Sequence, residues 1–220
     1  MERETSLNKA KEIMGENFIG LEEFLSIKKE MGIHIPENTL ETLPLVDFPE
    51  DLLERCKNDY LLILGIPFYK DGSELTIVKM RDHFGCNPEK SEPCFYNQDW
   101  YIKEYFAKNM TLDFQWYLVK KNVFEEYRGM DPGDIIKNLK TKQILPSAIL
   151  CAFTFFSYYF LRNEYIWKND FVWCSDLDCN KDQIYIGRYF DSNKINKNGF
   201  NIHRYLSLKD HYSAIVEIKH

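Results

Sequence analysis

The sequence predicts an α+β protein in which a helical N-terminal region, residues 1–59, precedes a mixed domain of helices and short antiparallel strands, residues 60–220. Two patterns favour this fold class. Helix caps and apolar residues at helical spacing recur before residue 60, whereas aromatic and β-branched runs separated by polar turns fill the last fifth of the chain. With 220 residues, 45% of them hydrophobic, the chain can bury a substantial core.

Three helices are expected in the N-terminal region. Ser6 opens the first, because its hydroxyl can accept hydrogen bonds from the exposed amides of the first turn. The second runs from Leu21 to Gly32, a residue type that commonly ends helices. The third follows Pro49, since a proline loses no hydrogen bond in a first helical turn. All three signals are local in the sequence.

The middle of the chain alternates strands and helices. The run from Tyr60 to Phe68 is short, apolar and punctuated by Gly65 and Pro67, which favours a buried strand. Downstream we expect a helix after Ser73, a loop over 85–98, a helix capped by Asp99 that reads WYIKEYFAKN, a strand over 114–121 and a helix opened by Asp131. This alternation is typical of a mixed domain.

Residues 144–161 form the longest apolar run, ILPSAILCAFTFFSYYFL, and approach the length that spans a bilayer. Pro146 would start a helix inside the run, and Ser147 and Ser157 interrupt its apolar character. We therefore expect a buried core helix and no membrane span. Lys142 and Arg162 at the two ends keep a membrane helix as the alternative.

Charge and cysteine usage narrow the function class. A formal net charge of -6 argues against general nucleic-acid binding, because such proteins usually present a basic face to the phosphates. The sequence starts at Met1 without a basic and then apolar leader, so a cytoplasmic location is expected. Six scattered cysteines in a chain of this size favour reduced thiols over disulfides.

The C-terminal segment reads as sheet. FVWCS, residues 171–175, and QIYIGRYF, residues 183–190, flank a polar turn, as the strands of a β-hairpin do. Asn193, Asn196, Asn198 and Gly199 predict a second turn region. The terminal SAIVEIK is expected to close the sheet as its last strand.

The turn between the two hairpin strands carries a spacing of oxygen ligands. Asp176, Asp178, Asn180 and Asp182 follow the every-second-residue pattern of the first half of a calcium loop. The match is incomplete, because Lys181 and Gly187 stand where that loop has its glycine and its glutamate. Asp and Asn are also common in hairpin turns. The spacing therefore fits two interpretations, a site for calcium or another divalent cation and a purely structural turn.

A contact surface for a ligand is the main functional prediction. Tyr, Arg and His combine stacking area with polar tips, which suits recognition of another molecule. The expected binding residues, predicted to be exposed and clustered, are Tyr185, Arg188, Asn201, His203, Arg204, Tyr205, His211 and Tyr212.

A family resemblance covers nearly the whole chain. It is carried by KEIMGENFIGLEEF, YNQDWYIKEYFA, WYLVKK, LPSAILCAFTFFSYYFL and FVWCSDLDCNKDQIYIGRYFDSNKIN, which resemble a family of uncharacterised bacterial proteins. The C-terminal part resembles the C-type-lectin-like fold of formylglycine-generating enzymes and of variable proteins of diversity-generating retroelements, through LPSA and IGRYFDSNKIN. The resemblance implies a C-type-lectin-like domain over residues 60–220 whose irregular loops display a binding surface. It does not imply catalysis, since no redox-active cysteine pair is matched.

Three function classes follow from these observations. The first is a non-catalytic protein that binds an unknown protein or small-molecule ligand, with no cofactor. The second is a metal-assisted enzyme that uses the loop from Asp176 to Asp182 together with His203 or His211, because converging carboxylates near a histidine can hold a metal and activate water. The third is a structural or phage-related interaction protein.

Overall fold

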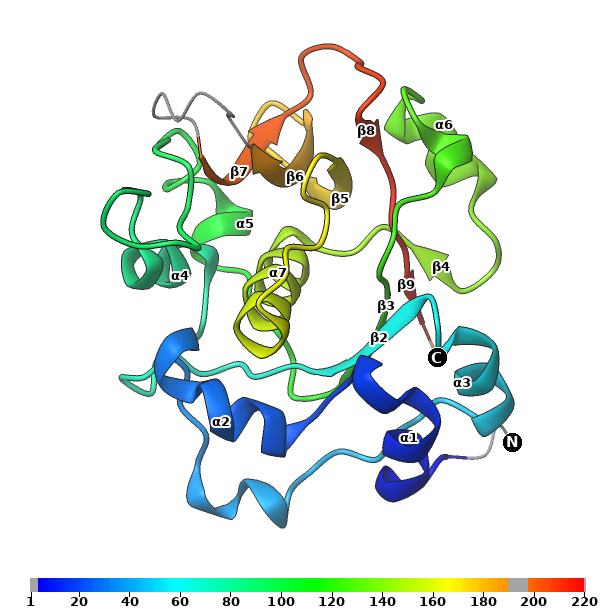
Figure 1. The fold of residues 1–220 in the computed structure, drawn as a ribbon. Helices are drawn as coiled ribbons and strands as arrows, with labels where there is room; N and C mark the ends of the chain where they lie inside the picture. Colours follow the sequence, from blue (N-terminus) through cyan, green and yellow to red (C-terminus); the bar gives the residue numbers. More distant parts are fainter. Residues whose placement is uncertain (1–3, 190–197, 220) are drawn as a thin grey trace.

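The computed structural model describes residues 4–189 and 198–219, and it combines helices with two separate sheets, as the α+β prediction requires (Figure 1). The helices are α1 (Leu7–Met14), α2 (Leu21–Met31), α3 (Glu50–Cys56), α4 (Ile77–Phe84), α5 (Tyr105–Lys108), α6 (Pro132–Asn138) and α7 (Ala148–Arg162), with short 3-10 turns η1 (Gly15–Asn17), η2 (Glu37–Leu40) and η3 (Glu125–Tyr127). Within the described ranges, no helix is both long enough and apolar enough to cross a membrane.

The local helix signals are confirmed in their geometry. The Ser6 hydroxyl accepts from the amide of Lys9 at 3.3 Å and caps α1. Gly32 ends α2 with a φ of 61°, in the left-handed region that favours glycine. The Asp131 carboxylate accepts from the amide of Gly133 at 2.8 Å and caps α6. Each cap satisfies backbone groups that a helix end leaves unpaired.

The helix expected over WYIKEYFAKN is shorter than the sequence predicts. Only α5, its second half, is helical, and residues 100–103 form turns. The indole Nε1 of Trp100 donates to the carbonyl of Ile202 at 3.2 Å, and Tyr101 is buried. Contacts with a distant strand therefore override the helical spacing of these residues.

The strands form a five-stranded sheet in the order β1-β2-β3-β9-β4 and a four-stranded sheet in the order β7-β6-β5-β8. They are β1 (Phe18–Ile19), β2 (Tyr60–Leu64), β3 (Trp116–Lys120), β4 (Gln143–Ile144), β5 (Phe171–Leu177), β6 (Gln183–Tyr189), β7 (Gly199–Arg204), β8 (Tyr212–Ser213) and β9 (Glu217–Ile218). Most neighbours are antiparallel, and the exceptions are the parallel pairs β1–β2 and β5–β8.

The N-terminal region contributes a strand as well as helices. Phe18 and Ile19 of β1 pair in parallel with Leu62 and Ile63 of β2, so residues on either side of the expected boundary at 59 share one sheet. Buried residues from α1 to Val216, which directly precedes β9, also belong to one continuous hydrophobic core. The division into a region of residues 1–59 and a domain of residues 60–220 stays a prediction from the sequence.

The C-terminal segment divides between the two sheets. SAIVEIK was expected to be one strand, but β8 lies in the four-stranded sheet and β9 in the five-stranded sheet. Between them, the carbonyls of Ala214 and Val216 accept from the amides of Phe124 and Lys120 at 2.9 and 2.8 Å. The hairpin β5–β6 forms as predicted, whereas Asn193 and Asn196 of the second turn region lie outside the described residues.

The apolar run near residue 150 forms the central helix, α7, which lies in the middle of the molecule in Figure 1. Its first turn is capped twice, since the Ser147 hydroxyl accepts from the Leu150 amide at 3.3 Å and the Asp176 carboxylate accepts from the Ala148 amide at 2.6 Å. The helix contacts α2, α4, α5, β5 and β6. Residues 148–157 are all buried, which explains why the run is apolar on every face.

Aromatic rings join α7 to its neighbours. The stacked pair Phe84–Phe156 has ring centroids 4.0 Å apart and nearly parallel planes. Two further pairs, with centroids 5.1 and 4.8 Å apart, are Phe24–Phe153 and Phe155–Phe200. One helix thus packs against an N-terminal helix, a middle helix and a C-terminal strand.

We expect Phe156→Ala to lower the free energy of unfolding by about 3–5 kcal/mol, because it leaves a cavity where three elements meet. The matched control is Tyr105→Ala, since Tyr105 is 71% exposed. Chemical denaturation of both variants measures the difference. Similar losses for the two variants would contradict the central role of α7.

Candidate functional site

The predicted contact residues lie on β6, on β7 and in the segment that follows β7, but they differ in exposure. Tyr185, Arg188 and Tyr212 are buried, contrary to the expectation that all eight are exposed. Asn201, His203, Arg204 and Tyr205 are half-buried, and His211 is exposed. Burial depends on which face of each strand a residue occupies and on what packs against that face, and the sequence pattern did not resolve either.

Two of the buried residues, Tyr185 of β6 and Tyr212 of β8, form a tyrosine pair in the four-stranded sheet. The hydroxyls of Tyr185 and Tyr212 lie 3.1 Å apart, and both rings pack edge-on against Trp173. Burial, with the neighbouring hydroxyl second, raises the pKa of Tyr185 well above its ordinary range. Tyr185 therefore stays neutral, and the two tyrosines form part of a second core cluster with Phe171 and Ala214.

Arg188 is held in a buried ionic contact. Its Nη2 donates to the Glu92 carboxylate at 2.7 Å, and its guanidinium lies 4.1 Å from the ring centre of Tyr165. The Tyr165 hydroxyl donates to the same carboxylate at 2.8 Å. Arg188 thus joins β6 to the loop before α5 and offers little surface to a ligand.

His203 and Arg204 are positioned by the residues beneath them. The His203 ring stacks on Tyr185 with centroids 5.4 Å apart and planes 7° from parallel, and its Nδ1 accepts from the Arg204 amide at 2.9 Å. The Arg204 guanidinium lies 5.4 Å from the Trp100 ring centre and donates to Asp178 at 3.3 Å. Both side chains are fixed while part of each reaches the solvent.

Two leucines, which no pattern in the sequence singles out, follow directly. Leu206 is 69% exposed and Leu208 is 38% exposed. They lie between Tyr205 and His211, whose ring packs edge-on against Tyr212. We call Asn201, His203, Arg204, Tyr205, Leu206, Leu208 and His211 the C-terminal surface. An apolar centre with polar neighbours is typical of a contact with another protein.

Two aspartates of the hairpin, Asp176 and Asp178, accept hydrogen bonds from backbone amides. The amides of Asn180 and Asp182 donate to one oxygen of the buried Asp178 carboxylate at 2.8 and 2.9 Å, and Arg204 donates to the other oxygen. Burial raises the pKa of Asp178, but these donors lower it by more, so it lies below its ordinary range. Asp176 instead caps α7, and burial raises its pKa.

These contacts direct the Asp176 and Asp178 carboxylates to different partners. Across residues 4–189 and 198–219, no three His, Cys, Asp or Glu side chains are grouped closely enough to hold a metal ion. A calcium or other divalent-cation site at Asp176, Asp178, Asn180 and Asp182 stays a prediction, as does the metal-assisted enzyme built on it.

The thiols do not resemble activated nucleophiles. Burial raises the pKa of Cys56 to about 11 and that of Cys94 to about 12, and it also raises the pKa of Cys174. A thiol attacks as the thiolate, so these groups are inert at neutral pH. The exposed Cys179 has its pKa raised by Glu104. The cysteines are free, in agreement with the reduced thiols expected from the sequence.

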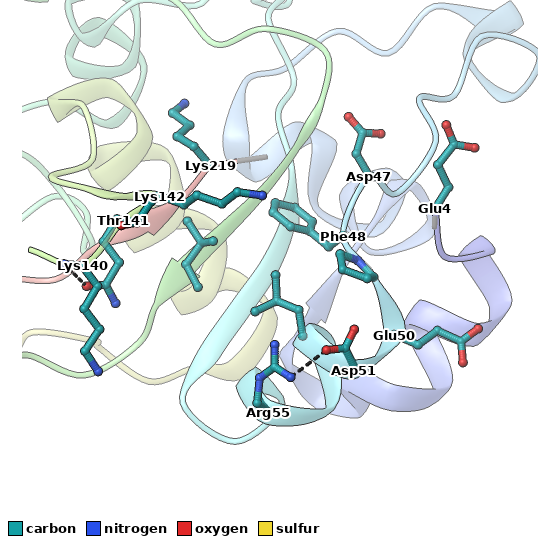
Figure 2. A pocket seen from close by; sticks show the side chains of 14 residues that line it. Glu4, Asp47, Phe48, Glu50, Asp51, Arg55, Lys140, Thr141, Lys142 and Lys219 are labelled. Atoms are coloured by element: carbon teal, nitrogen blue, oxygen red, sulfur yellow. Dashed lines mark hydrogen bonds and ion pairs between the residues drawn. The ribbon is translucent and has the colours of Figure 1, made fainter. Parts of the chain in front are cut away.

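A charged groove of about 860 Å³ lies on another face, near α3 and the β4–β9 pair. Figure 2 shows carboxylates on one side of it and lysine ammonium groups on the other, with Phe48 between them. The acidic wall consists of Glu4, Asp47, Glu50 and Asp51, and the basic wall of Lys140, Lys142 and Lys219. Phe48 is buried, so the apolar surface comes from the half-buried Leu52 and Ile218. The groove therefore offers both charges around an apolar strip.

Local structure explains the acidic wall. Glu50 and Asp51 occupy the first turn of α3, where the helix dipole favours negative charge. Phe48 is held by its carbonyl, which accepts from the Thr5 hydroxyl at 2.6 Å. Asp51 is paired with Arg55 at 2.7 Å, whereas Glu50 forms no ion pair with the part of the chain that the structure describes.

The basic wall comes from the other end of the sequence. Lys140 precedes β4, and Lys219 follows β9 and pairs with Glu217 at 2.5 Å. Lys140 has no ion-pair partner among the residues described. No sequence motif indicates this groove, because its walls come from four segments that lie far apart in the chain. Glu50 and Asp51 at the start of α3 and the closely spaced Lys140 and Lys142 are the local signals in the sequence.

Neither family models, nor curated proteins, nor solved structures compared with this chain match it.

We expect Asp178→Ala to lower the free energy of unfolding by about 2–3 kcal/mol at pH 7, because two buried amides and Arg204 lose a charged acceptor. Since the pKa of Asp178 is lowered on folding, its stabilisation is present above its ordinary pKa and is lost as the pH falls below it. The difference from the wild type should therefore shrink in acid.

The control is Asp182→Ala, whose backbone, not its carboxylate, makes the turn contacts. Denaturant titrations at several pH values, with calcium or with a chelator, provide the measurement. We expect calcium to leave the melting temperature unchanged. A calcium-dependent rise that Asp178→Ala abolishes would support the metal site and contradict the structural interpretation.

Proposed function

We propose that this protein is a non-catalytic binding protein whose ligand is a segment of another polypeptide. The observation that supports this most directly is the charged groove, with carboxylates on one wall and lysines on the other. Its volume falls in the range of about 300–1,000 Å³ that is usual for ligand sites.

A polypeptide segment fits this groove better than other ligand classes. A nucleic acid would meet the carboxylates of Asp47 and Glu50, which repel phosphates, and the net charge of -6 adds to that repulsion. A simple anion or cation would use one wall alone. A peptide with side chains of both signs can pair with Lys140 and Glu50 while an apolar side chain contacts Leu52.

The C-terminal surface is the second candidate contact. Leu206 and Leu208 would contribute apolar area. The His203 ring and the Arg204 guanidinium are already held in place, so they would orient a bound partner at little entropic cost. Tyr185, Arg188 and Tyr212 are left out of this surface because they are buried. The C-type-lectin-like arrangement of residues 60–220 after a helical N-terminal region is retained as part of the same proposal, since such folds present loops for binding.

Selection of random peptides displayed on phage against the purified protein tests the groove. We expect the recovered peptides to carry both charges, and we expect Lys140→Glu and Glu50→Lys each to weaken binding of the synthetic peptides about tenfold, or about 1.4 kcal/mol. Lys137→Glu is the control, because Lys137 is exposed on α6, is not among the residues that line the groove, and pairs with Asp134. Peptides of one charge sign, or equal affinities for all variants, would refute the groove as the site.

A photo-crosslinking residue placed at position 206 tests the C-terminal surface in extracts of the cells from which the gene comes. Position 45 is the control, since Leu45 is 63% exposed and belongs to the segment between η2 and α3. A captured protein is then purified and titrated. We expect Leu206→Asp to weaken that complex at least about tenfold and Leu45→Asp to leave it unchanged. Capture of the same protein from both positions would count against the C-terminal surface as the contact site.

A further inference from the structure

A separate cavity and a neighbouring hollow lie between the end of α2, η2 and the segment after β2. The cavity measures about 230 Å³ and is lined mostly by apolar side chains, among them Ile35, Ile66, Pro67, Phe68 and Phe114. The hollow measures about 770 Å³ and is lined by Lys28, Lys29 and Lys70 with Glu37 as its acidic residue. His34, Ile35 and Pro36 line both, so the two spaces adjoin along this segment.

Backbone pairing brings the lysines together. Ile33 bridges to Tyr69, the His34 amide donates to the Phe68 carbonyl at 3.0 Å, and the Lys70 amide donates to the Gly32 carbonyl at 2.9 Å. This short ladder places Lys70 beside the last turn of α2, which carries Lys28 and Lys29. None of the three lysines forms an ion pair within the described part of the chain. The hollow therefore has unneutralised positive charge.

The cavity wall has few polar groups left for a polar ligand. The Thr39 hydroxyl donates to the Pro36 carbonyl at 2.5 Å, and the Thr42 hydroxyl lies within 3.4 Å of the Asn38 and Thr39 carbonyls. These hydroxyls are occupied within η2 and its end. The volume exceeds the roughly 150 Å³ that accommodates benzene in an engineered apolar cavity. A ring or a short acyl chain fits such a space.

We propose that this pair of spaces binds a single-chain amphiphile with an anionic head, such as a medium-chain fatty acid. The chain occupies the apolar cavity, and the carboxylate lies in the hollow beside Lys28, Lys29 and Lys70. Charge complementarity selects an anion over a neutral amphiphile, and the limited cavity volume selects one chain over a two-chain lipid. This site is distinct from the charged groove and does not depend on the proposed binding of a polypeptide.

Calorimetric titration with hexanoate, octanoate and decanoate, below the concentrations at which micelles form, tests the proposal. We expect affinity to rise about fourfold per methylene until the cavity is filled, the factor that about 0.8 kcal/mol per buried methylene gives. Decanol, which has no charge, should bind at least about tenfold more weakly than decanoate. Added salt should weaken decanoate binding and leave decanol unchanged.

Variants separate the two parts of the site. Lys28→Gln combined with Lys70→Gln should weaken decanoate at least about tenfold without changing decanol, whereas Thr42→Phe, which fills the cavity, should weaken both. Lys108→Gln on α5 is the control for loss of an exposed lysine. Equal binding of decanoate and decanol, no binding of either, no effect of the lysine variants, or binding to anionic vesicles alone would overturn the proposal.

Discussion

The packing of aromatic rings around α7 is the constraint on which the rest of the structure depends. Phe153, Phe155 and Phe156 project from one helix onto α2, β7 and α4, which come from the start, the end and the middle of the chain. The part of α7 over residues 148–157 is buried on all sides, so it cannot shift without disturbing every neighbour, because protein interiors are packed at crystal-like density. Its position also fixes the hairpin β5–β6, since the carboxylate of Asp176 caps its first turn.

The same hairpin connects the core to the C-terminal surface. Asp178 organises the turn through backbone amides and at the same time holds Arg204, while the buried Tyr185 supports the ring of His203. The predicted contact residues thus divide into two sets. A buried inner set, such as Tyr185, supports the side chains above it, and an outer set, such as His203, reaches the solvent. A rigid inner set lowers the entropy that the outer set would lose on binding.

Local signals in the sequence predicted much of the fold. Caps such as Ser6 and Asp131 act through neighbouring amides, and the hairpin follows from strand patterns on either side of a turn, so neither needs distant information. Tertiary contacts decided the rest. Phe18 and Ile19 are too short a run to predict a strand, and Trp100 leaves a helical pattern to reach Ile202. The charged groove and the lysine-lined hollow are assembled from segments far apart in sequence, and no spacing rule could join them.

The division of the C-terminal segment between two sheets has a consequence for biosynthesis. Before residues 212–218 emerge from the ribosome, β3 and β5 each have one neighbouring strand in place and one open edge, because β9 and β8 are the missing partners. Open strand edges recruit foreign strands, and partly folded nascent chains are prone to aggregate. A single short stretch, translated after both, closes the two edges together, so both edges stay exposed in the nascent chain until this stretch has emerged and paired.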